Sequence, residues 1–260
     1  MSARLARKLK SSLLRASKLK LGTFLVRRVN KRKQIYKLHY PNDLQYLKRR
    51  LLPGDVLLVE GDHGVSDWIK VYSSHTWSHC ALFVGDQPRA TAMAPKTFIE
   101  ENPTLVEAII GRGVILGSLS KYEGCNLRIC RPRTLARLQR ETVIQWALGK
   151  VGVSYDLENV LQFISLPFEE QVPPTRDIGE AGSGKFTCSS LLAAAFARVG
   201  LDVLHYYDPS TKTIVAYHHS HIQPKDFDLS PSFDIIKIHP VAYRKPGGFL
   251  STLLSRKKTA

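Results

Sequence analysis

The sequence predicts an α+β fold, in which an antiparallel sheet or small barrel packs against helices. Short apolar runs typical of strands follow one another between residues 55 and 131, and segments with helical spacing follow between residues 137 and 200. Consecutive strands followed by helices favour this class, whereas strict alternation of strands and helices would favour a parallel sheet. At 260 residues the chain can form one sizeable core, or two at most.

Six segments rich in aliphatic and β-branched residues are expected to form strands. The first follows a turn signal, Pro53-Gly54-Asp55, and the second is apolar on both faces, which predicts a central position in the sheet. In chain order the predicted strands span residues 56–60, 78–85, 105–110, 113–116, 127–131 and 233–239.

Four helices are expected, at residues 66–72, 137–149, 157–164 and 188–200. In the second of these, Leu138, Ile144 and Leu148 are predicted to face inward. Residues 165–186 form a long connection directly before the last helix. Loops of this length in compact domains are usually functional or disordered, so this segment is a candidate lid.

Positive charge is concentrated at the N-terminus. Residues 1–50 contain sixteen Lys and Arg and one acid, and so carry +15 of the formal charge of +16. Residues 1–34 are therefore predicted to be a basic amphipathic or disordered arm, residues 35–245 the catalytic domain, and residues 246–260 a flexible basic tail. An arm of this kind fits an anionic membrane surface. A solvated disordered segment, a targeting peptide and non-specific contact with nucleic acid are the alternatives.

The chain has no apolar run long enough to span a bilayer. Its four cysteines do not suggest a disulfide scaffold, which favours a reducing compartment. A cytoplasmic protein attached peripherally to membranes is therefore expected. Specific nucleic-acid binding is not expected, because the arm lacks interleaved aromatic residues and any recognisable module.

Cys188 is the candidate nucleophile. It is predicted to begin a helix that stops at Gly200, and a thiol in the first helical turn faces unpaired backbone N–H groups and the positive end of the helix dipole. Both features favour the thiolate. The alternative is a buried structural cysteine, because free cysteine packs like a small hydrophobe.

A cysteine hydrolase also needs a base and a group that orients the base. His79 opens an apolar strand and is the candidate base, with a satisfied core histidine as the alternative. Glu107 interrupts another apolar strand and is the candidate orienting group, because a charge in such a place is costly unless it is paired. A solvent-facing glutamate on an edge strand is the alternative.

The order of several short motifs resembles that of the circularly permuted papain-like amidases of the YiiX/YaeF type, relatives of the NlpC-type cell-wall peptidases. These motifs lie between Leu51 and His239 and are Pro53-Gly54-Asp55, Ser66-Asp67-Trp68-Ile69-Lys70, Trp77-Ser78-His79, Val106-Glu107-Ala108, Tyr155-Asp156 and Thr187-Cys188-Ser189. The resemblance implies a histidine strand that precedes the cysteine helix, as here, with Cys188 as nucleophile, His79 as base and Glu107 as orienting group. The chain departs from the pattern at Ser190, where relatives often have an acid, and at Phe186, where a tyrosine is common.

The resemblance implies a thiol hydrolase that cleaves an amide or peptide-like bond through an acyl-enzyme, without metal or organic cofactor. One alternative is a thiol acyltransferase or lipid hydrolase acting at a membrane, which the basic arm favours. Another is a catalytically inactive module that binds peptides or lipids.

Two further motifs do not support a site. Residues 179–185 match most of a P-loop, but Phe186 stands where magnesium binding needs Ser or Thr, and no strand is predicted before it. The tract His218-His219-Ser220-His221 has no cysteine or carboxylate partners at zinc-site spacing, and a polar loop is expected there.

Overall fold

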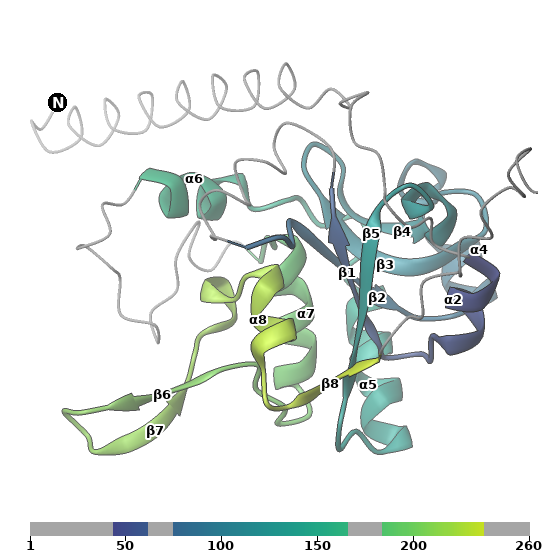
Figure 1. The fold of residues 1–260 in the computed structure, drawn as a ribbon. Helices are drawn as coiled ribbons and strands as arrows, with labels where there is room; N and C mark the ends of the chain where they lie inside the picture. The colour runs from purple at the N-terminus through teal and green to yellow at the C-terminus, as the bar shows by residue number, and fades with distance from the viewer. Residues whose placement is uncertain (1–43, 62–74, 166–183, 237–260) are drawn as a thin grey trace, which may run out of the picture.

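The computed structural model describes residues 44–61, 75–165 and 184–236 (Figure 1). Over these residues the chain is a mixed α+β protein whose antiparallel sheet packs against helices, as the sequence predicts. Six strands lie in the order β4-β3-β2-β1-β5-β8, with β4 and β8 as the outermost described strands. Their bounds are β1 Val56–Glu60, β2 His79–Phe83, β3 Pro103–Ile109, β4 Gly113–Ser118, β5 Asn126–Pro132 and β8 Phe233–Ile236.

The central strands are apolar on both faces because both faces of the sheet are covered. In β1, Val56 and Leu58 belong to one core cluster and Leu57 and Val59 to the other. The predicted central position of β2 is confirmed, since it pairs with β1 on one side and β3 on the other. A strand buried on both faces has no polar alternation, which explains its continuous apolar sequence.

Helices cover the two faces unequally (Figure 1). The larger core lies between the sheet and α5 (Arg137–Leu148), α7 (Cys188–Ala197) and α8 (Pro224–Leu229). The smaller core lies under α2 (Leu44–Arg50) and the 3-10 turn η2 (Leu119–Tyr122). The remaining described elements are α4 (Pro88–Met93), η1 (Lys96–Phe98), α6 (Leu157–Ser165), η3 (His219–His221), and the hairpin of β6 (His205–Asp208) and β7 (Thr213–Ala216).

Helix α7 is the central helix of the larger core. All its residues from Cys188 to Phe196 are buried, so the helix is enclosed around its whole circumference. Its predicted start at Cys188 is confirmed, and Gly200 follows its end with a positive φ of 74°. The prediction for α5 was partly wrong. Leu138 is 74% exposed, and Val143, Ile144 and Ala147 form the inward face.

Several predicted features lie outside the described residues. These are the arm at residues 1–34, the tail at 246–260, the helix at 66–72 and residues 166–183 of the candidate lid, which include most of the P-loop-like motif. The domain predicted at residues 35–245 is therefore described only in part. Within the described ranges, no helix has the length and apolar character needed to cross a membrane.

Candidate active site

Cys188 lies at the first position of α7, where a reciprocal pair of hydrogen bonds caps the helix. The Ser190 backbone N–H donates to Thr187 Oγ1 over 3.1 Å, and the Thr187 N–H donates to Ser190 Oγ over 2.8 Å. This capping box explains why a serine suits position 190. The cap aligns the first turn and leaves the positive end of the helix beside the sulfur.

His79 is the first residue of β2, and the loop before it is anchored from two sides. The Trp77 indole N–H donates to Asp228 over 2.9 Å, and the Arg128 guanidinium lies 5.0 Å from the Trp77 ring centroid. The Ser78 N–H donates to the Val59 carbonyl over 3.1 Å. These contacts hold the backbone that carries His79 where β2 meets the start of α7.

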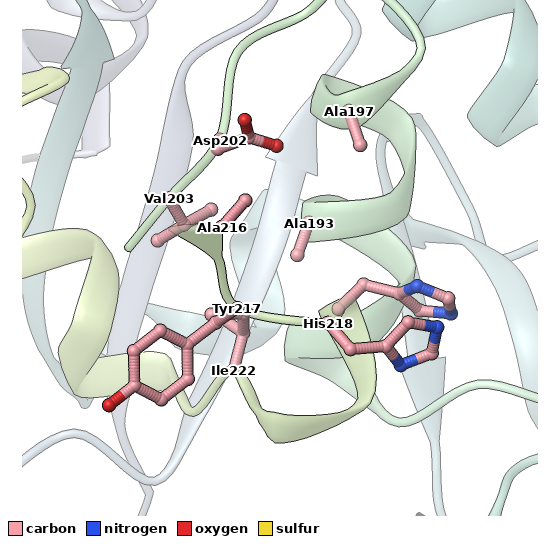
Figure 2. Close-up of a pocket in the computed structure, with 9 residues that line it drawn as sticks. Ala193, Ala197, Asp202, Val203, Ala216, Tyr217, His218 and Ile222 are labelled. Atoms are coloured by element: carbon pink, nitrogen blue, oxygen red, sulfur yellow. The ribbon is translucent and has the colours of Figure 1, made fainter. Parts of the chain in front are cut away.

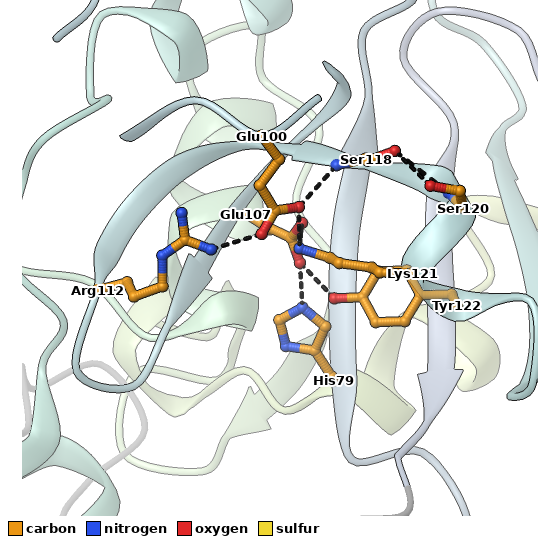
Figure 3. Close-up of polar contacts among 8 residues, drawn as sticks. All are labelled: His79, Glu100, Glu107, Arg112, Ser118, Ser120, Lys121 and Tyr122. Atoms are coloured by element: carbon orange, nitrogen blue, oxygen red, sulfur yellow. Dashed lines mark hydrogen bonds and ion pairs between the residues drawn. The ribbon is translucent and has the colours of Figure 1, made fainter. Parts of the chain in front are cut away.

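The structure brings the three predicted site residues together. His79 Nε2 lies 2.8 Å from Glu107 Oε2 (Figure 3). The imidazole and the Cys188 thiol also lie close enough for each to shift the pKa of the other. Because Nε2 is used by Glu107, Nδ1 is the ring nitrogen left for the sulfur. The His79 side chain is 19% exposed, so the ring can exchange protons with bound substrate or water.

The electrostatics of this contact favour separated charges. A hydrogen bond from Cys80 and the positive charge of His79 lower the pKa of Cys188 well below its usual value, although burial opposes this. Burial lowers the pKa of His79, but the Cys188 charge and hydrogen bonds to Cys188 and Glu107 outweigh it and raise that pKa to about 9. A thiolate beside an imidazolium is therefore the favoured state at neutral pH.

Glu107 is fully buried and is held by three polar partners (Figure 3). Besides His79, the Tyr122 hydroxyl donates to Oε2, and Lys121 Nζ lies 2.6 Å from Oε1. Burial raises the pKa of Glu107, but the hydrogen bond to His79 and the charge of Lys121 lower it to about 2. The carboxylate is therefore ionised throughout the physiological range.

Cys80 is a part of the site that the sequence did not reveal. It follows His79 in β2, lies in the same core as Cys188, and lowers the pKa of the Cys188 thiol. Burial and the charge of Cys188 raise the pKa of Cys80 well above its usual value, so Cys80 keeps its proton and acts as donor. All four cysteines are free thiols.

Lys121 and Tyr122 were also missed, because their partner Glu107 is distant in sequence and only strand pairing brings them together. The available signal was weak. It consisted of a short polar segment, Ser120-Lys121-Tyr122, directly after the predicted strand at 113–116. A buried carboxylate predicted at Glu107 calls for a cation nearby, but the sequence does not say which one.

A separate pocket of about 260 Å³ lies farther along α7 (Figure 2). It lies between the helix and the segments that flank the β6–β7 hairpin, and its walls include Ala193, Ala197, Val203, Tyr217, His218 and Ile222. None of the three predicted site residues lines it. In the histidine tract, His219–His221 form η3, and His218 and His219 line this pocket. Among the residues that the structure describes, no cluster of three or more His, Cys, Asp or Glu side chains is arranged to hold a metal ion.

No protein-family model matches the chain, and no curated protein matches it.

Proposed function

We propose that the chain is a thiol hydrolase that cleaves an amide or peptide-like bond through Cys188, His79 and Glu107. The observation that carries the proposal is the 2.8 Å contact between His79 and the buried Glu107, beside a cysteine at a helix N-terminus that raises the pKa of the imidazole. A permuted papain-like fold is part of this proposal. The histidine strand before the cysteine helix supports it, as does the resemblance to the YiiX/YaeF-type amidases.

In the proposed reaction the Cys188 thiolate attacks the acyl carbon, and a C–S bond forms while the carbonyl π electrons move to oxygen. We expect the backbone N–H of Cys188, at the start of α7, to donate to this oxyanion. When the oxyanion collapses, the C–N bond breaks and the His79 imidazolium gives its proton to the leaving amine. A water then attacks the thioester, His79 takes its proton, and the thiolate leaves. Glu107 keeps the imidazolium oriented throughout.

A second candidate is a thiol acyltransferase or lipid hydrolase acting at a membrane. The observation that favours it is the charge of +15 on residues 1–50, which fits attachment to anionic lipid. The chemistry at Cys188 would be the same up to the thioester, and the acceptor or the acyl donor would differ. With the basic arm as a peripheral membrane anchor, either reaction would take place in the cytoplasm at a membrane surface.

The test is alkylation of Cys188 by iodoacetamide between pH 5 and 9, followed residue by residue by mass spectrometry. Wild-type Cys188 is expected to be alkylated at pH values well below the ordinary thiol pKa of about 8.5. His79→Ala is expected to abolish this reactivity at low pH. Cys130 is an internal control, because burial raises its pKa to about 12 and it should stay unreactive in both proteins.

If Cys188 behaves as an ordinary or inert thiol in wild type, the hydrolase proposal fails and a catalytically inactive binding module takes its place. If Cys188 is activated, the two enzyme candidates are separated by their acyl donors. Incubation with peptide amides and with phospholipid vesicles is followed by intact-mass detection of an acyl group on Cys188. An acyl adduct that forms only from phospholipid would favour the second candidate.

A further inference from the structure

The carboxylate of Glu107 lies between two cations. His79 Nε2 approaches Oε2 over 2.8 Å from one side, and Lys121 Nζ approaches Oε1 over 2.6 Å from the other (Figure 3). Glu107 is 0% exposed and Lys121 is 25% exposed. Lys121 also lies 2.9 Å from Glu100 Oε2, and Glu100 contacts Arg112 farther out. Charges therefore alternate in sign from the buried sulfur to the protein surface.

Gly117 provides the space that this arrangement needs. It lies on β4, two residues beyond Ile115, which is the register partner of Glu107. A Cβ atom at position 117 would lie 1.8 Å from Glu107 Oε1 and 3.0 Å from Lys121 Nζ. Contacts that close do not occur between non-bonded atoms, so only glycine leaves the carboxylate and the ammonium group in place.

We propose that Lys121 is a positioning residue for this site, whose ammonium group, seated over Gly117, keeps the buried Glu107 carboxylate ionised and turned towards His79. The inference rests on the proposed function, because it assigns the support of the same thiolate–imidazolium pair. Lys121 does not contact the sulfur in this arrangement and acts through Glu107.

The physical reason is the cost of burying a carboxylate. An isolated charge in a protein interior is strongly unfavourable, and one hydrogen-bonded partner seldom compensates it fully. With only His79 and the Tyr122 hydroxyl as partners, Glu107 could lower its energy by taking the imidazolium proton, which would leave a neutral acid beside a neutral imidazole. The charge of Lys121 opposes that transfer because it stabilises the ionised carboxylate. The titratable groups that interact electrostatically with Glu107 are His79 and Cys80 on β2, Glu100 before β3, and Lys121 and Tyr122 in η2, while Cys188 on α7 interacts with His79.

The experiment measures the alkylation rate of Cys188 against pH in wild type, Lys121→Met and Lys121→Arg. In Lys121→Met the Glu107 carboxylate is expected to protonate at higher pH. Loss of the Lys121 charge also disfavours the thiolate. Both effects therefore move the acidic limb of the profile, the pH range in which the alkylation rate first rises, to higher pH. We expect the limb to shift by about one pH unit in Lys121→Met. In Lys121→Arg, which keeps the charge, the limb should stay close to its wild-type position. Arg112→Met is the matched control, because it removes a cation from the exposed outer pair and should leave the limb in place.

A purely structural role for Lys121 would lower the urea midpoint of Lys121→Met without moving the acidic limb, and that result would overturn the inference. If Lys121→Met does not fold, Lys121→Gln removes the charge while keeping a hydrogen-bond donor, and the same shift is expected. The two proposals fail in different ways. If wild-type Cys188 is not alkylated at low pH, the proposed function is overturned. If wild-type Cys188 is alkylated at low pH and the profile is unchanged in Lys121→Met and Lys121→Gln, only the role of Lys121 is overturned.

Discussion

At the scale of single residues, the candidate site combines a thiol of lowered pKa with an imidazole of raised pKa. Two neighbours of Cys188, Cys80 and His79, both favour its thiolate. The pKa of His79 is in turn raised by the Cys188 thiolate and by Glu107. Each charge therefore exists because of the other, and removing one partner should return the remaining group towards its ordinary behaviour.

Cys188→Ala should lower the pKa of His79. The thiolate charge is the largest influence that raises this pKa to about 9, and burial then acts against the imidazolium. A fall of one unit or more is expected. The measurement is an NMR titration of the imidazole nitrogens, with Cys125→Ala as control. An unchanged His79 pKa in Cys188→Ala would show that the two groups do not interact.

Glu107→Gln should narrow the pH range of the thiolate–imidazolium pair. Without the carboxylate, the pKa of His79 falls and that of Cys188 rises, so the alkylation rate of Cys188 near pH 6 should drop about tenfold or more. The variant should also be less stable by at least ~1 kcal/mol, because Lys121 and Tyr122 lose a buried partner. Glu123→Gln is the control for both measurements, because Glu123 is exposed and directly follows η2, which carries Lys121 and Tyr122.

At the scale of elements, the start of α7 presents the sulfur, and the Thr187–Ser190 pair forms that start. Thr187→Ala should lower the free energy of unfolding by roughly 1 kcal/mol, because an N-cap bond is lost. Thr187→Ser, which keeps the hydroxyl that accepts this bond, should retain most of the wild-type free energy of unfolding. Urea denaturation measures the effect, and Thr142→Ala on the exposed side of α5 is the control. Equal midpoints for Thr187→Ala and wild type would mean that the cap contributes nothing.

The elements that sequence could predict are those with strong local patterns. The strands at 56–60 and 78–85 are continuous apolar runs because both faces of the sheet are buried. Exposed elements were missed. The β6–β7 hairpin pairs Tyr207 with Ile214, whose exposed fractions are 60% and 74%, so no burial pattern marks it. The short helix α8 was also missed, although Pro224 at its first position and Asp226, which accepts from the Gln223 N–H, are helix-start signals.

The three site residues could be predicted because each breaks a local pattern: a histidine and a glutamate within apolar strands, and a cysteine at a helix start. Their supporting residues break no local pattern. Gly117 is one glycine in a strand, Lys121 is one lysine in a polar turn, and Cys80 resembles any core residue. Only the register of β3 with β4 and the packing of β2 against α7 give these residues a role.

At the scale of the whole molecule, charge is divided between an N-terminal arm and a nearly neutral body. Residues 51–260 carry a net formal charge of only +1. The largest excess of positive charge available to an anionic surface therefore lies in the first fifty residues. The candidate site itself carries no excess charge, because Cys188, Glu107 and Glu100 are matched by His79, Lys121 and Arg112.

The full chain should bind vesicles that contain anionic lipid and should not bind zwitterionic vesicles, and deletion of residues 1–34 should abolish most of the binding. Each basic residue near an anionic surface contributes about 1 kcal/mol. Co-sedimentation should weaken as salt is raised, since the Debye length falls from about 10 Å at 0.1 M to about 3 Å at 1 M. Binding that survives the deletion would place the lipid contact on the body of the protein.

The charge separation at Cys188 and His79 has a consequence that follows from counting protons. Near pH 7.5 the folded pair holds one proton, on His79, and the unfolded chain also holds one, on its cysteine. Unfolding then neither takes up nor releases a proton at this pair, so its share of the folding free energy has no slope with pH between about 6.5 and 9. Below about 6.5 the unfolded histidine gains a proton that the folded pair already has, and the contribution decreases as the pH falls. The protein can thus keep a reactive thiolate across the neutral range without making its own stability sensitive to pH there.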